Sequence, residues 1–430
     1  MSTVTKIKDN FIYLIKNFPD DWELSKNKYA FLKIRNGKNM SDTTDVLSLT
    51  INGIKIKEDL TFGKTSNSYI GHQLVNVGDL VFTPRDFDQT PILSDVSKYD
   101  GCISNLYIVD KPNKEFLPEY INYFWYGLKH SFDYFKNFSY GIRFSFNREQ
   151  FDEIPILKPS LNEQKIICTY LDDKLKHIDA LVNKIDKKIN LLKEQKTSLI
   201  NQCVTKGLDP NVETKDSGVE WIGEIPKHWE ITRLKYHGEV LIGLSFDKDD
   251  IVDEGQGTLV LRSSNVQNGQ VNFSDNVWVN TDVPDKLFVQ KGDILICSRN
   301  GSRDLIGKNC LLGQESIGMT WGVFMTVFRS RYSEFFYWIL NSQVFKSQSG
   351  LFLTSTINQL TVSTLKNLVF PFVSNRTEQN RINEFLKKET KSIDELIDSE
   401  QRRTSLLKEY RQSLISSVVT GKVRVTEDMI

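Results

Sequence analysis

The chain has 430 residues, 39% of them hydrophobic, and a formal net charge of zero, which favours two or three globular domains over a disordered or fibrous protein. No apolar run approaches the roughly 18 residues of a membrane span, and the five cysteines form no C-x-x-C pair, so we expect a soluble cytoplasmic protein without a metal site or disulfide framework. Because a protein that grips DNA alone normally carries a basic patch, the balanced charge argues against tight, autonomous nucleic-acid binding.

Two globular parts alternate with two long helical stretches along the chain. We place a first domain at 1–160 and a first spacer helix at 161–208. A second domain at 209–374 and a second spacer helix at 375–423 follow, and residues 424–430 form a tail. The predicted fold class is α+β, with two mixed domains rich in short strands.

The two spacer helices are copies of one sequence. "NLLKEQKTSLINQCVTKG" at 190–207 returns as "SLLKEYRQSLISSVVTGK" at 405–422, and a constant offset of 215 positions aligns the whole stretch without a gap. A weaker echo upstream pairs "VGDLVFTPRD" at 77–86 with "KGDILICSRN" at 291–300. The chain is therefore predicted to be a tandem duplication.

A Pro-x-x-Trp turn opens each domain. "FPDDWEL" at 18–24 aligns with "IPKHWEI" at 225–231. Trp22 and Trp229 could stack on bases, but their recurrence beside an apolar neighbour favours a role in anchoring the first strand of each domain in its core.

Both spacer helices carry an apolar heptad pattern whose steps alternate between four and three, which is typical of a coiled coil. The predicted seam residues are Ile178, Val182, Ile185, Ile189, Leu192 and Leu199 in the first helix and Ile393, Ile397, Leu407, Leu414 and Val418 in the second. Because each copy needs an apolar partner, we expect the helices to pack antiparallel about a pseudo-two-fold axis and to hold the two domains apart.

Polar loops that follow two buried strands or a predicted helix are the candidate DNA contacts, because Arg and Asn can bind guanine and adenine edges while Ser and Thr suit phosphates. A solvated loop is the alternative interpretation of each. In the second domain the candidates are Arg262, Ser263, Asn265, Arg299, Asn300, Ser302, Arg303, Thr354, Thr356 and Asn358. In the first domain they are Arg85, Asp86, Gln89, Tyr140, Arg143 and Ser145.

Enzyme motifs fail on inspection. An amino-methyltransferase would be expected to show an Asn/Asp-Pro-Pro-aromatic loop, and the eleven prolines include no Pro-Pro pair. The segment "GSRDLIGKN" at 301–309 has five residues between its glycines where a phosphate loop has four. We therefore predict no catalytic residue and no cofactor in this chain.

Longer stretches resemble a known family. "DSGVEWIGEIPKHWEITRLKYHGEV" (216–240), "GDILICSRNGS" (292–302), "TEQNRINEFLKKETKSIDELI" (377–397) and the closing "VVTGK" are similar to the DNA specificity subunit of type I restriction-modification systems. The resemblance implies two target-recognition domains, each reading one half of a bipartite double-stranded DNA sequence, in a subunit that does no chemistry. The first domain departs furthest, because it lacks the Trp-Ile-Gly that precedes the second Pro-x-x-Trp turn.

The resemblance also implies partners. Two methyltransferase subunits would dock on this chain, joined in the restricting complex by two motor-nuclease subunits, and S-adenosylmethionine, ATP and magnesium would bind to those partners. The alternative hypothesis is a coiled-coil scaffold that assembles proteins without reading DNA. A symmetric scaffold has no reason to diversify "SRNGSR" from "PRDFDQ", so we favour a subunit that directs adenine methylation and restriction.

Overall fold

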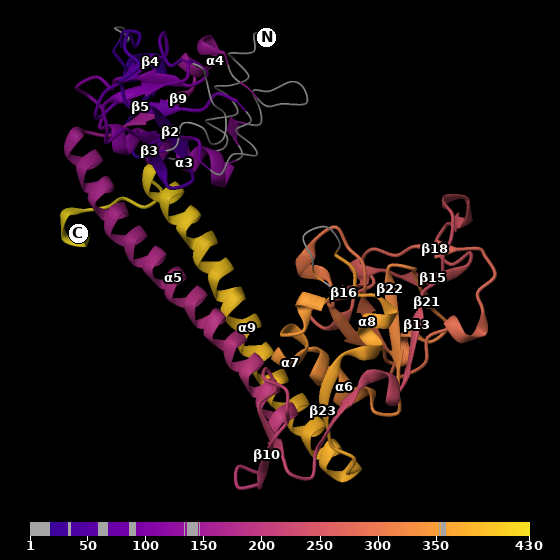
Figure 1. Cartoon of the computed structure of the whole chain (residues 1–430). Coiled ribbons are helices and arrows are strands. Elements are labelled where there is room, and N and C mark those ends of the chain that lie inside the picture. The colour runs from indigo at the N-terminus through magenta and orange to yellow at the C-terminus, as the bar shows by residue number, and fades with distance from the viewer. Residues whose placement is uncertain are drawn as a thin grey trace. The chain divides into compact units, whose positions relative to one another are not determined.

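The computed structural model forms two compact units. It describes residues 18–32, 36–58, 68–85, 92–132, 134–135, 145, 147–351, 353 and 358–430. Unit 1 combines the chain up to Asp186 with Gln401–Ile430, and unit 2 is Lys187–Glu400. Each unit contains a mixed domain, one half of helix α5 (Leu161–Lys206) and one half of helix α9 (Arg376–Val419) (Figure 1).

The domain of unit 1 is built from short strands around one longer helix. Its strands are β1 (Glu23–Lys26), β2 (Leu47–Thr50), β3 (Gly53–Ile56), β4 (Gln73–Val75), β5 (Leu80–Phe82), β6 (Ser94–Val96), β7 (Gly101–Ile103), β8 (Ile108–Asp110) and β9 (Pro155–Lys158). Its helices are α2 (Asn27–Ala30), α3 (Pro118–Phe132) and α4 (Arg148–Asp152). The strand order β6-β5-β8 forms the central sheet, and Phe82 of β5 packs edge-on against Trp125 of α3, with ring centroids 5.1 Å apart.

The domain of unit 2 has two larger sheets, ordered β13-β22-β19-β20 and β14-β18-β15-β21. Its strands are β10 (Thr214–Asp216), β11 (Glu224–Pro226), β12 (Glu230–Arg233), β13 (Glu239–Ile242), β14 (Ile251–Val252), β15 (Thr258–Leu261), β16 (Val266–Gln267), β17 (Gln270–Val271), β18 (Trp278–Val279), β19 (Ile294–Cys297), β20 (Asn309–Leu311), β21 (Thr320–Trp321), β22 (Met325–Arg329) and β23 (Val369–Phe372). Its short helices are α6 (Ser333–Leu340), α7 (Gln343–Lys346) and α8 (Val362–Asn367).

One turn leads into the central strand of both domains. A glycine with φ near 90° is followed by a buried aspartate, Asp79 before β5 and Asp293 before β19. The Oδ2 atom of each aspartate accepts a hydrogen bond from the backbone N–H three residues earlier, at 2.7 Å in unit 1 and 2.9 Å in unit 2. β5 then pairs antiparallel with β6 and β8, as β19 pairs with β20 and β22. The repeated Gly-Asp motif therefore builds the same turn twice.

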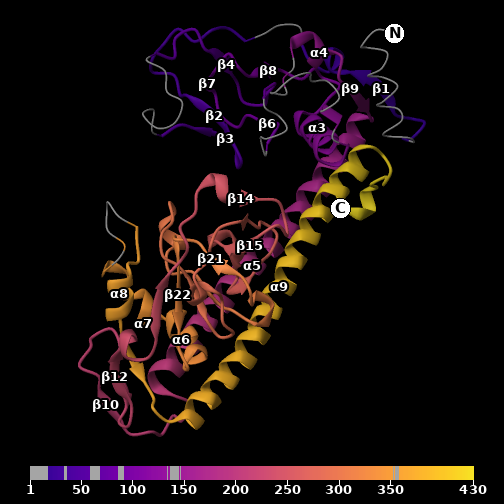
Figure 2. The same ribbon diagram turned by 90° about the vertical axis from the view of Figure 1, so that its right-hand side faces the viewer.

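The long helices run antiparallel within each unit (Figures 1 and 2). In unit 2, Lys188 of α5 donates to Glu400 of α9 at 2.6 Å, and Lys196 donates to Asp394 at 2.7 Å. Residue numbers rise along α5 while they fall along α9, which is the antiparallel order.

The ion pairs follow the sequence repeat. Arg411 of α9 donates to Asp179 of α5 at 3.1 Å in unit 1. The offset of 215 positions relates Arg411 to Lys196 and Asp179 to Asp394, so unit 2 holds the same ion pair with the two helices exchanged. The sequence repeat therefore extends to the ion pairs between the helices within each unit.

The predicted seam residues are withdrawn from solvent. Ile178, Ile185, Ile189, Ile393, Ile397, Leu414 and Val418 are buried, and Val182, Leu192, Leu199 and Leu407 are half-buried. With the antiparallel helix pair and the two mixed domains, the predicted α+β fold class is confirmed.

The two Pro-x-x-Trp tryptophans are buried and therefore not available for base stacking. Trp22 is 5% exposed and Trp229 is fully buried. The indole N–H of Trp229 donates to Glu378 at the start of α9, and that of Trp22 donates to Glu163 at the start of α5. Each tryptophan thus ties its domain to the first turn of a long helix.

Candidate nucleic-acid interface

Several loops of unit 2 meet at one edge of its sheets. β15 and β21 run parallel, so their carboxyl ends lie together, and β19 runs antiparallel to β22, so the end of β19 meets the start of β22. Residues 322–324 join β21 to β22 and therefore connect both sheets at this point. We define the loop edge of unit 2 as 262–265, 298–303, 322–324, 353 and 358–359.

Hydrogen bonds hold three of these loops together. The side-chain amide of Asn300 donates to Ser263 Oγ at 3.0 Å. Lys308 Nζ donates to the carbonyl of Ser263 at 2.8 Å, and the Arg303 guanidinium donates to the carbonyl of Leu353 at 3.1 Å. Candidates that lie far apart in the sequence are thus neighbours in the structure.

Arg299 lies exposed where these loops meet. Its backbone forms an antiparallel bridge with Gln359, and its guanidinium carbon lies 5.4 Å from the centre of the Phe324 ring. Ser302 is exposed, and Asn358 is half-buried and bridges to Leu353. The backbone of Arg299 is therefore held in place, while its guanidinium stays open to a ligand.

Asn265 differs from the expectation of an open contact residue. It is fully buried, its amide donates to the carbonyls of Asn272 and Asp275 at 3.0 Å each, and it accepts from the Arg262 backbone at 2.9 Å. The Arg262 guanidinium donates to Asp275 Oδ1 at 2.8 Å. Because its amide is engaged inside the domain, Asn265 shapes the loop and does not face a ligand.

Unit 1 contains a matching loop edge. The end of β5 lies beside the start of β8, and Arg85 forms an antiparallel bridge with Ser145, both exposed. The alignment of the Gly-Asp turns equates Arg85 with Arg299, and the same offset equates Ser145 with Gln359. Six further candidates lie outside the described residues: Asp86, Gln89, Tyr140, Arg143, Thr354 and Thr356.

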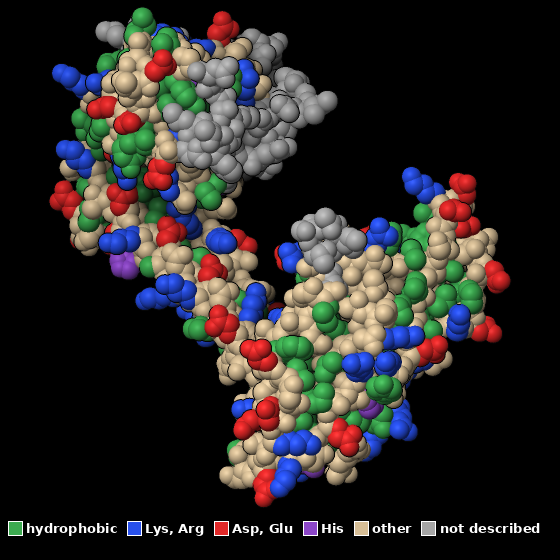
Figure 3. Space-filling view, viewed as in Figure 1, with side chains coloured by type: hydrophobic (Ala, Val, Ile, Leu, Met, Phe, Trp, Pro, Cys, Tyr) green, Lys and Arg blue, Asp and Glu red, His purple; other side chains and the backbone are tan. Residues whose placement is uncertain are grey.

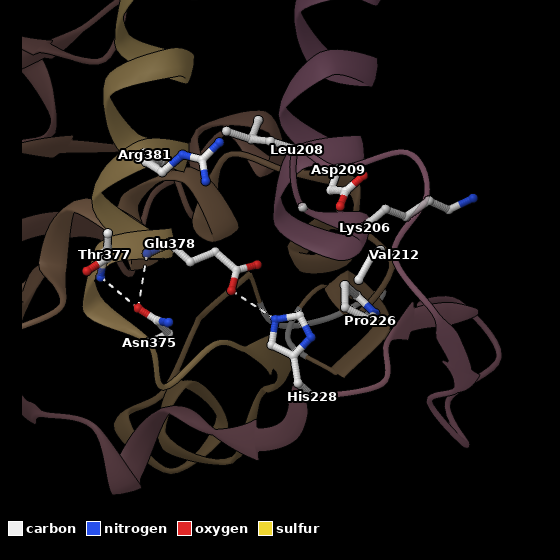
Figure 4. A pocket seen from close by; sticks show the side chains of 11 residues that line it. Lys206, Leu208, Asp209, Val212, Pro226, His228, Asn375, Thr377, Glu378 and Arg381 are labelled. Carbon is white, nitrogen blue, oxygen red and sulfur yellow. Dashed lines mark hydrogen bonds and ion pairs between the residues drawn. The ribbon is translucent and has the colours of Figure 1, made fainter.

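A separate cavity of about 280 Å³ lies in unit 2 where α5 ends and α9 begins (Figure 4). Lys206, Asp209 and Arg381 line it, together with an ion pair in which His228 Nε2 lies 2.9 Å from Glu378 Oε2. The charges are of both signs, and none of these residues was a sequence candidate. The cavity belongs to the junction between domain and helix.

The family model for the type I restriction modification DNA specificity domain matches residues 19–191. The MjaX type I restriction enzyme specificity subunit of Methanocaldococcus jannaschii is 26% identical over 440 residues, which cover 96% of each chain. The chain is a homologue of type I specificity subunits. The resemblance predicted from the sequence is confirmed.

Solved structures share the fold of this specificity-subunit homologue. A chain from a structure concerned with complex assembly and conformational transition of the type I R-M system has a TM-score of 0.70 at 14% identity, covering 95% of this chain and all of that one. The HsdS subunit of Thermoanaerobacter tengcongensis has a TM-score of 0.50 at 16% identity, covering 95% and 98%.

The relatives are named as specificity subunits, which supports the prediction that this chain is not itself a catalytic subunit. The thiols near the loop edge of unit 2 agree with that role. Burial raises the pKa of Cys297, more than the neighbouring Lys308 lowers it, and burial raises the pKa of Cys310 to about 12. Both thiols therefore stay protonated and unreactive.

In the part of the chain that the structure describes, no three His, Cys, Asp or Glu side chains gather as a metal would need. No helix among the same residues has the length and apolar character to cross a membrane.

Two residues at or beside the loop edge of unit 2 were not among the candidates predicted from the sequence. Lys308 supports Ser263, and Phe324 is 55% exposed beside Arg299. Phe324 was missed because the search followed polar residues after strands, while Phe324 precedes one. An aromatic residue directly before the first residue of a buried strand was the available signal.

Proposed function

We propose that this specificity subunit reads a bipartite double-stranded DNA sequence with its two loop edges and so directs adenine methylation and restriction by its partners. One observation carries the proposal. The bridge at Arg85 and Ser145 in unit 1 recurs at Arg299 and Gln359 in unit 2, so one backbone frame repeats the arginine and changes the residue opposite it. A frame that repeats while the residue opposite the arginine changes suits two half-sites of different sequence.

DNA binding by the chain alone would be weak. Basic and acidic side chains are interspersed on the face of each unit seen in Figure 3, which agrees with the net charge of zero. Non-specific affinity comes mainly from neutralised phosphates, so tight binding would require basic surface from partner subunits.

The helix pair offers a docking surface for two methyltransferase subunits. In unit 2, Leu191 and Leu396 are 63% and 50% exposed, and in unit 1, Leu406 and Leu181 are 64% and 41% exposed. Each leucine directly precedes a seam residue, which puts it at heptad position c or g, on one flank of an antiparallel pair. The repeat relates Leu181 to Leu396 and Leu191 to Leu406, so the surface occurs twice and suits two copies of one partner.

The remaining assignments follow from this role. Two motor-nuclease subunits would complete the restricting complex, and S-adenosylmethionine, ATP and magnesium would bind on partner subunits in the cytoplasm. We retain the proposed division of the chain into domains at 1–160 and 209–374, spacers at 161–208 and 375–423, and a tail at 424–430.

Alanine substitution of the edge arginines tests the proposal. In the complex with methyltransferase subunits, Arg299→Ala or Arg303→Ala should relax one half-site and Arg85→Ala the other. Loss of a bidentate guanine contact removes about 1–3 kcal/mol of discrimination. Sequencing of adenine methylation in cells reads both half-sites at once.

The control is Lys291→Ala, since Lys291 is exposed at the opposite end of β19. It should leave both half-sites unchanged. If the arginine variants relaxed both half-sites equally, or neither, while methyltransferase binding persisted, the scaffold hypothesis would gain support.

A further inference from the structure

Phe324 is exposed although its backbone is firmly held. Its carbonyl accepts hydrogen bonds from the N–H groups of Ser298 and Arg299, at 3.0 and 3.1 Å. The preceding Val323 donates to the carbonyl of Leu244 at 2.9 Å. The backbone of three chain segments thus fixes this turn, while 55% of the Phe324 residue surface remains open. The ring contributes little to the core, so the fold does not explain its presence.

The ring lies directly beside a candidate base-reading group. The Arg299 guanidinium carbon is 5.4 Å from the ring centre, close enough for a cation–π contact that leaves the guanidinium N–H groups free to point outward. In the major groove, Arg binds the O6 and N7 atoms of guanine, and apolar side chains contact the C5-methyl group of thymine. One arginine and one apolar side chain held together can therefore read two neighbouring base pairs.

An exposed apolar residue recurs at the matching position of unit 1. Phe82 is equivalent to Ile296, and the strand registers pair Phe82 with Ile108 and Ile296 with Thr326. Ile108 therefore corresponds to Thr326. Leu106 lies two residues before Ile108, as Phe324 lies two residues before Thr326. Leu106 is 50% exposed. Single exposed apolar side chains are ordinary on protein surfaces, but two at equivalent positions of two loop edges call for a shared reason.

We propose that Phe324 contacts the C5-methyl group of a thymine adjacent to the guanine bound by Arg299, and that Leu106 contacts a thymine in the other half-site. This inference rests on the proposed function and adds to it the base that these apolar residues select. It makes Phe324 and Leu106 specificity-determining residues alongside the arginines.

Replacing single thymines by deoxyuridine tests the contact, because it removes only the methyl group. The purified complex of this chain with its methyltransferase subunits would be titrated with duplexes of its own target, each with one such replacement. One replacement in the half-site read by unit 2 should weaken binding about fourfold, since burying one methyl group contributes about as much as one methylene. The Phe324→Ala complex should bind the thymine duplex about fourfold more weakly and no longer distinguish the two duplexes.

Tyr236→Ala is the matched control, since Tyr236 is 70% exposed and lies near Glu239, which pairs with Arg329 at the far end of β22. That variant should behave as the unaltered complex. Leu106→Ala should remove the methyl sensitivity of the other half-site only. Thermal unfolding of each variant excludes loss of the fold as the cause.

Two failures can be told apart. If no deoxyuridine replacement weakens binding, or if Phe324→Ala keeps the methyl sensitivity, the thymine contact is overturned while the half-site effect of Arg299→Ala stands. If Arg299→Ala leaves both half-sites unchanged, the proposed function itself fails.

Discussion

The two units anchor their long helices through the same acid and different second partners. In unit 1, Glu163 accepts from the tryptophan of the Pro-x-x-Trp turn and from Arg424 at 2.7 Å. In unit 2, the equivalent Glu378 accepts from its tryptophan and pairs with His228 at 2.9 Å. The tryptophan is buried and repeats, whereas the second partner of the carboxylate is exposed and changes. Repetition between the halves therefore follows burial.

The second partners come from different segments, since His228 belongs to the Pro-x-x-Trp turn of unit 2 and Arg424 follows α9. Arg424 belongs to the tail after α9, which returns to unit 1 and also pairs with Asp21. The repeat aligns Arg424 with Asp209, which lines the cavity of Figure 4. The same position of the repeat is thus an arginine that pairs with Glu163 in unit 1 and an aspartate that lines the cavity in unit 2. At the loop edges, the bridge and its arginine repeat, while the residue opposite the arginine changes from Ser145 to Gln359.

The strongest test of this comparison lengthens both helices equally. Inserting one heptad after Ile189 and one after Thr404, which are equivalent positions, preserves the seam and the antiparallel pairing. Seven residues add roughly 10 Å at 1.5 Å per residue, which is about three base pairs at about 3.4 Å each. The half-sites should stay the same while the gap between them grows by about three base pairs.

Methylation sequencing of cells carrying the insertion measures the half-sites and the gap together. The added base pairs also rotate one half-site by about 100° around the duplex, so affinity should fall. Methylation at the original spacing alone would show that the helices do not set the gap.

The buried aspartates of the Gly-Asp turns should differ in their cost of removal. Asp293 binds the Arg329 guanidinium through both oxygens, at 2.7 and 2.8 Å, and this hydrogen bonding raises the pKa of Arg329. Asp79 accepts instead from Asn36 and a backbone N–H. Asp293→Ala leaves a charge without its partner and should cost about 3–5 kcal/mol, whereas Asp79→Ala should cost about 1–3 kcal/mol.

Urea unfolding of the two variants, with hydrogen exchange to assign each transition to its unit, measures both costs. Equal losses would mean that the ion pair of unit 2 adds nothing to the shared turn.

Replacing the exposed leucines of one unit should abolish the docking of one methyltransferase subunit and leave the other site intact. Leu191→Glu with Leu396→Glu changes unit 2 only, and Leu181→Glu with Leu406→Glu changes unit 1 only. Each double variant should bind one methyltransferase subunit where the unaltered chain binds two, because a buried carboxylate at an apolar contact is costly. Light scattering of the purified complexes counts the subunits.

Two control variants place the same glutamate on the other flank of the helix pair, to separate the effect of charge from the loss of the leucines. Lys193→Glu and Lys408→Glu follow seam residues, so they lie at heptad position e, away from the leucines. Both should leave two subunits bound. Loss of docking in these controls, or its survival in the leucine variants, would move the docking surface elsewhere.

The elements that the sequence predicted well are those with periodic or duplicated signals. The heptad and its copy predicted the antiparallel pairing, because a seam residue such as Ile189 must find an apolar partner. The Gly-Asp echo predicted the alignment of Arg85 with Arg299. The burial of Asn265 could not be predicted, since four hydrogen-bonding groups that saturate its amide come together only in the folded loop. Phe324 was not predicted as a contact residue, because the candidates were chosen for their polar side chains.

The smallest expected effect concerns the acid side of the stability profile of unit 1. Burial would raise the pKa of Glu163, but bonds from Arg424, Ser160 and Trp22 outweigh burial and lower it below the ordinary 4.5. A carboxylate with a lowered pKa contributes stability above its unfolded pKa and loses that contribution as the pH falls through its folded pKa. Glu163→Gln should therefore destabilise unit 1 by about 1 kcal/mol or less at pH 7, and the difference from the unaltered chain should shrink below pH 4.5. Urea unfolding between pH 7 and 3, assigned to unit 1 by hydrogen exchange, measures it, with Glu378→Gln as the equivalent change in unit 2. A difference that stays constant down to pH 3 would show that the Arg424 bond does not stabilise the ionised carboxylate, and that the two junctions are alike in spite of their different second partners.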